Sequence, residues 1–363
     1  MMNNKVLDTV GNHTINKFKL ITTYTRDWAY KLLNYSECDG IIFIDCMCNS
    51  GKYINKDTGE LIDGTAILVA IELLHAAKKY PNKTVQLFFN DYNEDRIYFL
   101  RNQLSAIVLN APKNYKIHLS SLDSSFFLKR FTNNGIKNSN TLLIYDPYNV
   151  NIDWKALDLF INTWGEVIIN HMVSDIIRNR SQILKKDVIE RYENSYLTEF
   201  DNLVNIPKGE FQVKIETIIK RISKKNAFIS TVPFYIKTNI QIYNLIHISH
   251  SSKGFILFKK IAWKLGGGQS AIKEKGKVAN LKLLLDEEDN FDCENNYTME
   301  DMMNHVIMVF ADKGNVHINE IYEYLDNHPI FVADGFKKDI KIYLKKVYDC
   351  RIINDVVIFN GVK

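Results

Sequence analysis

The chain has 363 residues, 46% of them hydrophobic and 24% charged, and its formal net charge is +4. This composition is ordinary for a soluble globular protein, and the length allows one large domain plus a smaller unit. No apolar run is long enough to cross a bilayer, the Asn-rich start is not a signal peptide, and the five cysteines lack regular spacing. We therefore expect a cytoplasmic protein with reduced thiols, no bound metal and no membrane partner.

The positive charge is unevenly distributed along the chain. Residues 297–363 contain eight Lys or Arg against ten Asp or Glu, so residues 1–296 contain 38 against 32. A surplus of six positive charges in the longer part is compatible with a nucleic acid partner but does not require one.

The first half of the chain is predicted to alternate between helices and strands. The helices are 17–33, 64–75, 94–109 and 153–163, and the strands are 41–45, 85–90, 116–119, 141–145 and 166–170. The connection 46–63 is expected to be an unusually long loop. This alternation predicts an α/β fold with a Rossmann-like parallel sheet covered by helices on both faces.

The alternation stops at about residue 172. Residues 172–226 are predicted to form a helical, polar insertion, which is either a solvated cap or a lid over the carboxyl edge of the sheet. Strand character returns over 228–249, and the first domain is expected to end at residue 265. The Gly-rich and charged stretch 266–296 then has the composition of a linker.

Residues 297–363 are predicted to form a second, α+β domain. A capping box at Thr298 opens a helix over 299–311, and further helices follow at 318–326 and 334–348. Residues 351–360 have the pattern of a hairpin that turns at Asn354-Asp355. Three helices followed by a two-stranded wing is the winged-helix order.

The third helix of this domain carries lysines on one face. Lys337, Lys341 and Lys345 are spaced four residues apart, so that face could contact phosphates in DNA. The net charge of −2 in residues 297–363 favours the alternative, a solvated face or a protein-docking face.

Acidic residues follow three of the predicted strands. Asp45 ends the apolar run 41–45, Asp91 follows the second strand, and Asp123 follows the third. Ligands of open α/β sheets bind at these carboxyl ends. In a fold that binds S-adenosylmethionine, Asp45 and the loop with Asn49 and Gly51 would meet the methionine part. Asp91 would take both ribose hydroxyls and Asp123 the adenine amino group.

The alternative for these acids is purely local, since Asp also caps the helix or turn that follows a strand. Three such acids in successive βα units favour a cofactor site. Phosphate-binding motifs are not present: Lys52 is followed by Tyr53 rather than Ser or Thr, and no Gly-x-Gly-x-x-Gly pattern occurs.

The strongest catalytic candidate is Asp146-Pro147-Tyr148, at the end of the strand 141–145. Acceptor atoms of such a turn can hold an exocyclic amine while the aromatic ring stacks on a flat base, which positions the nitrogen for methyl transfer. The same tripeptide also occurs in plain loops because proline favours turns.

Several ordered motifs between residues 13 and 265 resemble the three-Cys-motif partner proteins (TcmP), a family of prokaryotic and phage proteins. The motifs are Ile44-Asp45-Cys46-Met47-Cys48-Asn49-Ser50-Gly51-Lys52-Tyr53, Gly64-Thr65-Ala66-Ile67-Leu68-Val69-Ala70-Ile71, Asp146-Pro147-Tyr148-Asn149 with Trp154, Ile168-Ile169-Asn170 and Ile242-Tyr243-Asn244-Leu245. The chain departs from the family at Asn49, which stands where the family has glycine. Asparagine tolerates the left-handed backbone that such a turn needs.

This resemblance implies a class I methyltransferase sheet, S-adenosylmethionine as cofactor and a three-cysteine-motif protein as partner. Together with the residues above, it predicts a methyltransferase that acts on nucleic acid or on a base amine held at Asp146 and Tyr148. The competing hypothesis is a catalytically degenerate binding protein that docks a partner protein or DNA through its winged helix, and the altered loop at Asn49 favours it. Another kind of base modification is also compatible with the sequence.

Overall fold

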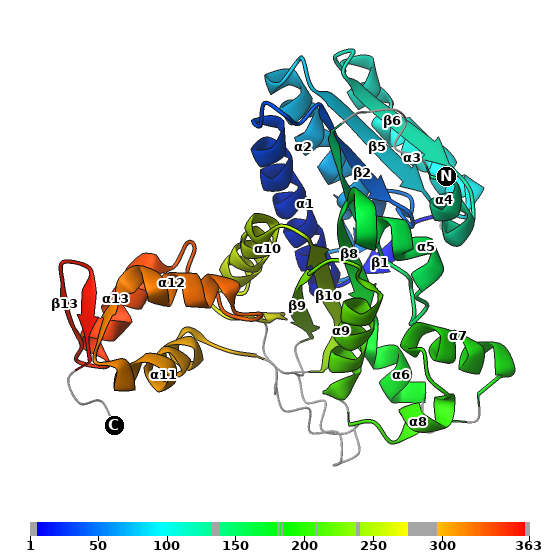
Figure 1. Ribbon diagram of the computed structural model, residues 1–363. Helices are drawn as coiled ribbons and strands as arrows, with labels where there is room; N and C mark the ends of the chain where they lie inside the picture. The colour runs from blue at the N-terminus through cyan, green and yellow to red at the C-terminus, as the bar shows by residue number, and fades with distance from the viewer. Residues whose placement is uncertain are drawn as a thin grey trace.

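A mixed α/β body is built around one large sheet (Figure 1). The computed structural model describes residues 6–131, 138–179, 182, 184–207, 209–236, 240–274 and 296–359. Most of the linker predicted over 266–296 lies outside these residues. Within them, no helix is both long enough and apolar enough to span a membrane.

The eight strands of the sheet lie in the order β11-β9-β10-β8-β7-β2-β5-β6. Their bounds are Gly40–Asp45 (β2), Thr84–Asn90 (β5), Tyr115–Ser120 (β6), Ser139–Tyr145 (β7), Gly165–His171 (β8), Phe228–Tyr235 (β9), Gln241–Ser249 (β10) and Ile272–Lys273 (β11). Strands β6, β5, β2, β7 and β8 are parallel, and β10 runs antiparallel to both β8 and β9. The α/β class with a largely parallel sheet is therefore confirmed.

The order of the parallel strands reverses at β2. The chain moves outward from β2 to β5 and β6, then returns to pair β7 with the other side of β2. Such a topological switch point leaves a crevice at the carboxyl ends of the two central strands, where open α/β sheets bind ligands.

Both faces of the sheet are buried by helices, because successive residues of a strand point to opposite faces. Ile41 and Phe43 of β2 pack with one cluster of buried side chains, and Ile42 and Ile44 with another. The first cluster includes α1 (Asn12–Leu33), α2 (Thr65–Lys79), α3 (Glu94–Leu109) and α10 (Ser252–Leu265). The second includes α4 (Ser124–Arg130), α5 (Trp154–Leu159), α6 (Val173–Asn179), α7 (Lys186–Tyr196), α8 (Phe200–Val204) and α9 (Glu210–Ile222).

The connection 46–63 differs from the expected long loop. It contains strands β3 (Lys52–Asn55) and β4 (Leu61–Asp63), which form a small sheet with β1 (Asp8–Val10). Each strand is short and only partly buried, so it lacks the apolar run that marks a core strand. This small sheet brings the N-terminal segment next to the loop after β2.

The helix predicted over 153–163 is also different in the structure. Its α-helical part ends at Leu159, and a π-helix covers Phe160–Trp164 before Gly165, whose φ of 150° is open to glycine. The short helix α4 was not predicted, because its seven residues show no helical repeat.

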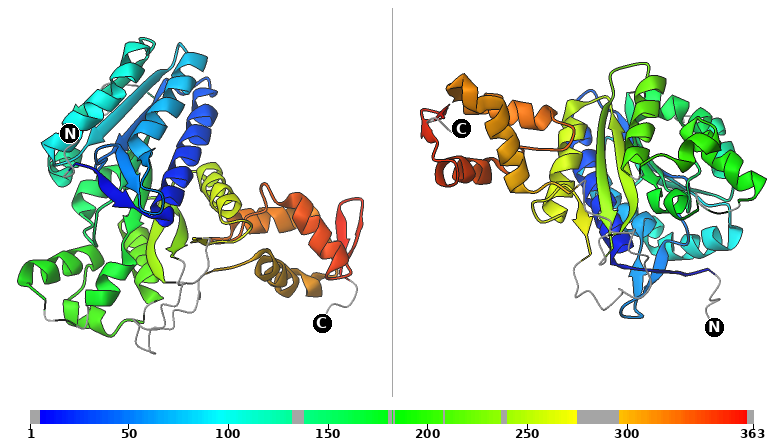
Figure 2. Two further views of the ribbon diagram at one scale, coloured as in Figure 1. Left: turned by 180° about the vertical axis from the view of Figure 1, so that it is seen from behind. Right: turned by 90° about the horizontal axis from the view of Figure 1, so that it is seen from below.

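Residues 296–359 project from the sheet on the side of α10 (Figures 1 and 2). They contain α11 (Met299–Phe310), a 3₁₀ turn (Ala311–Lys313), β12 (Asn315–His317), α12 (Ile318–Asn327), α13 (Lys337–Lys346), β13 (Arg351–Ile353) and β14 (Val356–Ile358). The capping box at Thr298 is confirmed, and the hairpin turns at Asn354 and Asp355, as expected. Strand β12 was not predicted; it adds a third strand beside β14.

The C-terminal unit is anchored to α10 through a buried lysine. Lys259 is 1% exposed, and its Nζ donates to the carbonyl oxygens of Leu325, Asp326, His328 and Phe331 at 2.5–3.4 Å. Leu325, Asp326 and His328 lie at the C-terminal end of α12, where the helix dipole favours a cation, and Phe331 lies in the segment that follows. Burial nevertheless lowers the pKa of Lys259 to about 7.

Candidate functional site

A cavity of about 400 Å³ opens at the switch point. Its walls come from β1, α1, α3, the loops after β2 and β7, and the adjacent ends of β8 and β10. The polar residues among them are Asp8, Thr9, His13, Thr14, Lys17, Asn49, Tyr53, Arg96, Asp146, Tyr148, Asn170 and Tyr243. Asn49 and the whole Asp146-Pro147-Tyr148 turn therefore line one cavity.

The loop after β2 turns sharply at two residues with positive φ. Asn49 has φ of 59° and Gly51 has φ of 76°. A Cβ on Gly51 would lie 2.5 Å from Cδ1 of Leu100, so the loop packs too closely on α3 for any side chain there. Gly51 therefore allows the sharp turn of the loop, and it does not line the cavity.

Asp91 lies directly below this loop and is 4% exposed. Its Oδ2 accepts from the backbone N–H of Asn49 at 3.0 Å, and its Oδ1 accepts from the backbone N–H of Asn93 at 2.9 Å. The guanidinium of Arg96 lies 3.9 Å from Oδ2. Asp91 thus fixes the loop after β2 to the start of α3, and it does not itself line the cavity.

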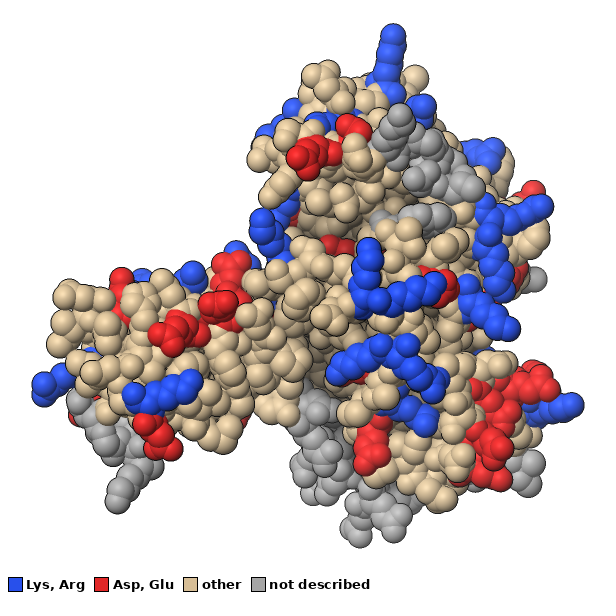
Figure 3. All heavy atoms as spheres, viewed as in Figure 1, with Lys and Arg blue, Asp and Glu red and all other residues tan. Residues whose placement is uncertain are grey.

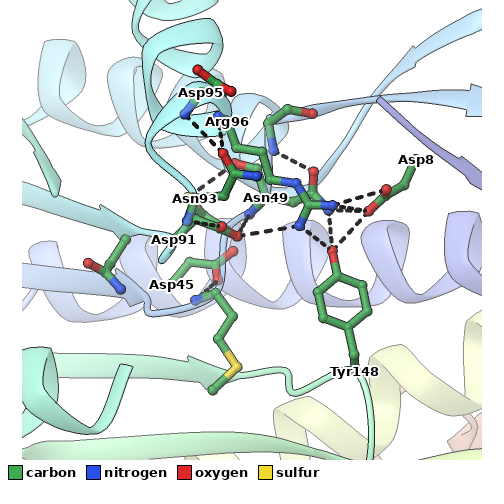
Figure 4. Close-up of polar contacts among 12 residues, drawn as sticks. Asp8, Asp45, Asn49, Asp91, Asn93, Asp95, Arg96 and Tyr148 are labelled. Atoms are coloured by element: carbon green, nitrogen blue, oxygen red, sulfur yellow. Dashed lines mark hydrogen bonds and ion pairs between the residues drawn. The ribbon is translucent and has the colours of Figure 1, made fainter. Parts of the chain in front are cut away.

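Four side chains from separate elements meet at the rim of the cavity, as Figure 4 shows: Asp8, Asn49, Arg96 and Tyr148. The Tyr148 hydroxyl donates to Oδ2 of Asp8 at 2.9 Å and accepts from Arg96 at 2.7 Å and from Asn49 at 2.6 Å. Arg96 also pairs with Asp8 at 3.1 Å. The Tyr148 hydroxyl is therefore engaged at the rim, and burial and the nearby Asp8 raise its pKa.

Asp146 makes two short hydrogen bonds inside the cavity. Its Oδ2 accepts from Nζ of Lys17 at 2.5 Å, and its Oδ1 accepts from Nδ2 of Asn170 at 2.5 Å. Lys17 belongs to α1 and is 7% exposed, and Asn170 lies near the end of β8 and is 3% exposed. Lys17 is the buried partner of this ion pair, whereas the Asp146 side chain is 25% exposed. The two hydrogen bonds hold both oxygens of Asp146 in place.

Asp45 lies behind this pair and is 4% exposed. Burial and the negative charge of Asp146 raise its pKa to about 7, although a hydrogen bond from the Met47 N–H and the charge of Lys17 oppose the shift. The carboxyl group is consequently poised to change its charge near neutral pH. A cationic ligand group beside it would favour the ionised form.

Asp123 stands apart from the other predicted residues. It is exposed, and its side chain caps α4 by accepting from the backbone N–H of Phe126 at 3.0 Å.

The loops after β2 and β6 are connected by Asn90, which is fully buried. Its amide donates to the carbonyl oxygens of Cys46 and Leu122 and accepts from Ser120 and Leu122.

The structure adds four residues to those singled out from sequence patterns as cofactor or catalytic candidates: Asp8, Lys17, Arg96 and Asn170. Asn170 belongs to the Ile168-Ile169-Asn170 motif of the resemblance but was given no role there, and the other three belong to no motif. Asn170 could have been found from its place at the end of a strand next to the switch point, as Asp146 was. Lys17 and Arg96 lie within helices, where the periodicity of the sequence shows which face of the helix a residue is on but not which residues of other elements it contacts.

A second hollow lies in the C-terminal unit. It has a volume of about 550 Å³ and lies between α12, α13 and the hairpin. Five lysines line it: Lys337, Lys338, Lys341, Lys345 and Lys346. Asp355 lies among them and pairs with Lys341 at 3.0 Å. Further acidic side chains gather over α12, as Figure 3 shows.

No protein-family model and no curated protein matches the chain. Among solved structures, precorrin-6y C5,15-methyltransferase from Geobacter metallireducens is 13% identical, with a TM-score of 0.31 over 62% of this chain and 87% of that one. A proposed methyltransferase from Streptococcus mutans in complex with SAH is 13% identical, with a TM-score of 0.32 over 62% and 94%. Protein LPL1258 from Legionella pneumophila is 12% identical, with a TM-score of 0.38 over 68% and 91%. The structural neighbours thus include methyltransferases, but TM-scores below 0.5 do not support a common function.

Proposed function

We propose that this protein is an S-adenosylmethionine-dependent methyltransferase whose acceptor is a nucleobase amine. The observation that carries the proposal is the gathering of the Asn49 loop and the Asp146-Pro147-Tyr148 turn around one cavity at the switch point of the sheet. In this proposal residues 1–265 form the methyltransferase domain, with residues 172–226 as its helical cap. Residues 266–296 are the linker and 297–363 the winged-helix domain.

Of the five residues assigned to the cofactor, Asn49 lines the cavity, and the other four lie outside its lining. Asp45, whose pKa is raised to about 7, would take the ammonium of the methionine part beside the backbone of Asn49 and Gly51. Asp91 already accepts two backbone hydrogen bonds, but a carboxylate has about four acceptor positions, so it retains capacity for ribose hydroxyls. Asp123 is solvent-exposed and would meet the adenine amino group. When bound, the cofactor supplies a methyl group on a sulfonium sulfur.

Asp146 would accept a hydrogen bond from the amine and so orient the nitrogen toward the methyl group. Methyl transfer would break the bond between the sulfonium sulfur and the methyl carbon, leaving S-adenosylhomocysteine, and the proton released by the nitrogen would pass to solvent, since Asp146 is already paired with Lys17. Pro147 fixes the turn, and stacking on a base requires the Tyr148 ring to leave its contacts with Asp8 and Arg96. The work of these groups is positioning, which alone can lower a barrier substantially.

Calorimetric titration with S-adenosylmethionine and S-adenosylhomocysteine tests the cofactor site. We expect micromolar binding that weakens at least tenfold in Asp91→Asn, which keeps one acceptor oxygen and removes the charge. Asp95→Asn is the matched control, because Asp95 is an exposed acid in the first turn of α3, the helix that begins shortly after Asp91. No binding by the wild type would overturn the proposal and favour the scaffold hypothesis.

The catalytic assignment is tested separately with Asp146→Ala. Turnover on single-stranded oligonucleotides should be lost while S-adenosylhomocysteine still binds, because Asp146 contacts the acceptor rather than the cofactor in this proposal. Retained turnover would overturn the role of Asp146.

The lysine-lined hollow supports a second candidate function, docking of nucleic acid by the winged-helix domain. The phosphate backbone would lie along α13, where five lysines share one hollow. Duplex DNA should bind with an affinity that falls steeply with salt, and replacement of Lys337, Lys341 and Lys345 by Gln should reduce that salt dependence. If these replacements have no effect on DNA binding, the hollow is better assigned to a partner protein such as the three-cysteine-motif protein.

A further inference from the structure

The wall of the switch-point cavity contains a buried acceptor without a partner. Asn170 is 3% exposed, and among the described residues its Oδ1 receives no hydrogen bond. The amide is oriented by Asp146: Nδ2 of Asn170 donates to its Oδ1 at 2.5 Å, so Oδ1 of Asn170 faces away from that carboxyl oxygen. An unsatisfied buried acceptor is costly, and a hydrogen bond from a bound ligand is one way to satisfy it.

Lys17 offers the complementary group beside it. An ammonium has three N–H donors, and Asp146 is the one hydrogen-bond acceptor that Lys17 has in the described part of the chain. The side chain is 9% exposed and lines the same cavity. Two donors of Lys17 are therefore left for a ligand, and Lys17 and Asn170 are linked through the two oxygens of Asp146.

We propose that Lys17, Asp146 and Asn170 together select an amino group that lies next to a ring-nitrogen acceptor, as on the edges of adenine and cytosine. The amino group would supply one N–H to Asp146 and one to Asn170 Oδ1, and the ring nitrogen would accept from Lys17. Thymine has one imide N–H in place of two amino hydrogens, so it leaves one of the two acceptors unsatisfied. This inference rests on the proposed function and names the acceptor chemistry of its site.

The test uses fluorescence anisotropy with the full chain and 11-residue oligothymidylates that carry one central substitution. The substituted bases are adenine, cytosine and their N,N-dimethyl derivatives, which keep the ring acceptor and lose both amino hydrogens. Binding is measured with saturating S-adenosylhomocysteine, which blocks the adenine subsite of the cofactor, and again without it. We expect at least one amino base to bind about fivefold more tightly than both its dimethyl derivative and thymine.

Two variants assign this preference to the residues named. Asn170→Ala and Lys17→Met should each reduce the preference to less than twofold. S-adenosylhomocysteine affinity should stay within twofold of wild type in Asn170→Ala, whereas Lys17→Met also removes a charge that lowers the pKa of Asp45 and should weaken cofactor binding. The matched controls are Asn102→Ala and Lys19→Met, which remove the same side chains from exposed helical positions. If the site takes free nucleosides rather than nucleic acid, millimolar deoxyadenosine or deoxycytidine will displace the oligonucleotide.

The outcomes separate the two claims. Equal binding of each amino base and its dimethyl derivative by the wild type overturns this inference without any variant, whether or not the cofactor binds. A preference that persists in both folded variants also overturns it. Absence of S-adenosylhomocysteine binding with a preserved amino-base preference instead overturns the methyltransferase proposal and leaves a base-binding site.

Discussion

Lys17 Nζ lies 2.5 Å from Oδ2 of Asp146, although 129 residues separate the two in the sequence. The contact joins the helix before the first central strand to the turn after β7, across the switch point of the sheet. A carboxylate that is predicted to hold an amine thus carries its own buried counter-ion. Charges placed this way retain their orientation and limit which ligand atoms can enter.

The raised pKa of Asp45 predicts that removing its charge stabilises the protein. Because the folded pKa of about 7 exceeds the ordinary carboxyl value of 3.8, the stability contributed by the protonated group is full below pH 4 and is lost as pH rises through 7. Asp45→Asn should therefore raise the free energy of unfolding at pH 8 by about 1–4 kcal/mol and change it little near pH 4. Urea denaturation at the two pH values measures this, and equal effects at both would contradict the shift.

The same group should make cofactor affinity depend on pH. In the proposed site the ionised Asp45 holds the ammonium of the methionine part, so affinity for S-adenosylhomocysteine should fall as pH drops from 8 to 6. Calorimetry at each pH measures the trend, and Asp45→Asn should bind weakly at every pH. A wild-type affinity that is constant over this range would argue against the assigned contact.

The tight turn at Gly51 predicts a large cost for a single methyl group. Gly51→Ala combines a positive φ of 76° with a contact of 2.5 Å to Leu100, whereas Gly59→Ala has a similar φ of 72° and no atom within 4 Å. We expect Gly59→Ala to cost about 1–2 kcal/mol from the backbone alone. Gly51→Ala should cost a further 1–3 kcal/mol from overpacking, and denaturation curves of the two variants give the difference.

Replacement of Asn49 by the glycine of the resembled family should open the cavity. Asn49→Gly keeps the left-handed turn, since glycine adopts a φ of 59° readily. It removes the side-chain hydrogen bonds to Asp8 and Tyr148. We expect S-adenosylhomocysteine to bind several-fold more tightly and the melting temperature to fall by a few degrees. An unchanged or weaker affinity would mean that the Asn49 side chain does not narrow the site.

The buried amino group of Lys259 should be needed for attachment of the C-terminal unit. Lys259→Met leaves several buried carbonyl oxygens without a donor, at about 1–3 kcal/mol for each group fully unsatisfied. The matched control is Lys260→Met, which removes a more exposed pair with Asp334 that is worth less than about 1 kcal/mol. Calorimetric melting should show a larger loss for Lys259→Met, and equal losses would assign the attachment to packing alone.

Local patterns in the sequence determined the elements and much of the loop chemistry. The apolar runs that end at Asp45 and Tyr145 are core strands because both faces of each are covered by helices. Capping residues such as Thr298 act on their own helix, so neighbouring residues are sufficient to predict them. For the same reason the turn at Asn354 and Asp355 could be predicted.

Tertiary structure alone decided which side chains meet. Asp8, Arg96 and Tyr148 come from three elements, and no spacing in the sequence relates them. Short, partly buried strands such as β3 could not be predicted from the sequence either, because they depend on a partner strand for their hydrogen bonds. The periodicity of the sequence indicates which face of an element is buried. Contacts between elements depend instead on the order of the strands and the placement of the helices. That arrangement places Lys17 and Asn170 next to the two oxygens of Asp146.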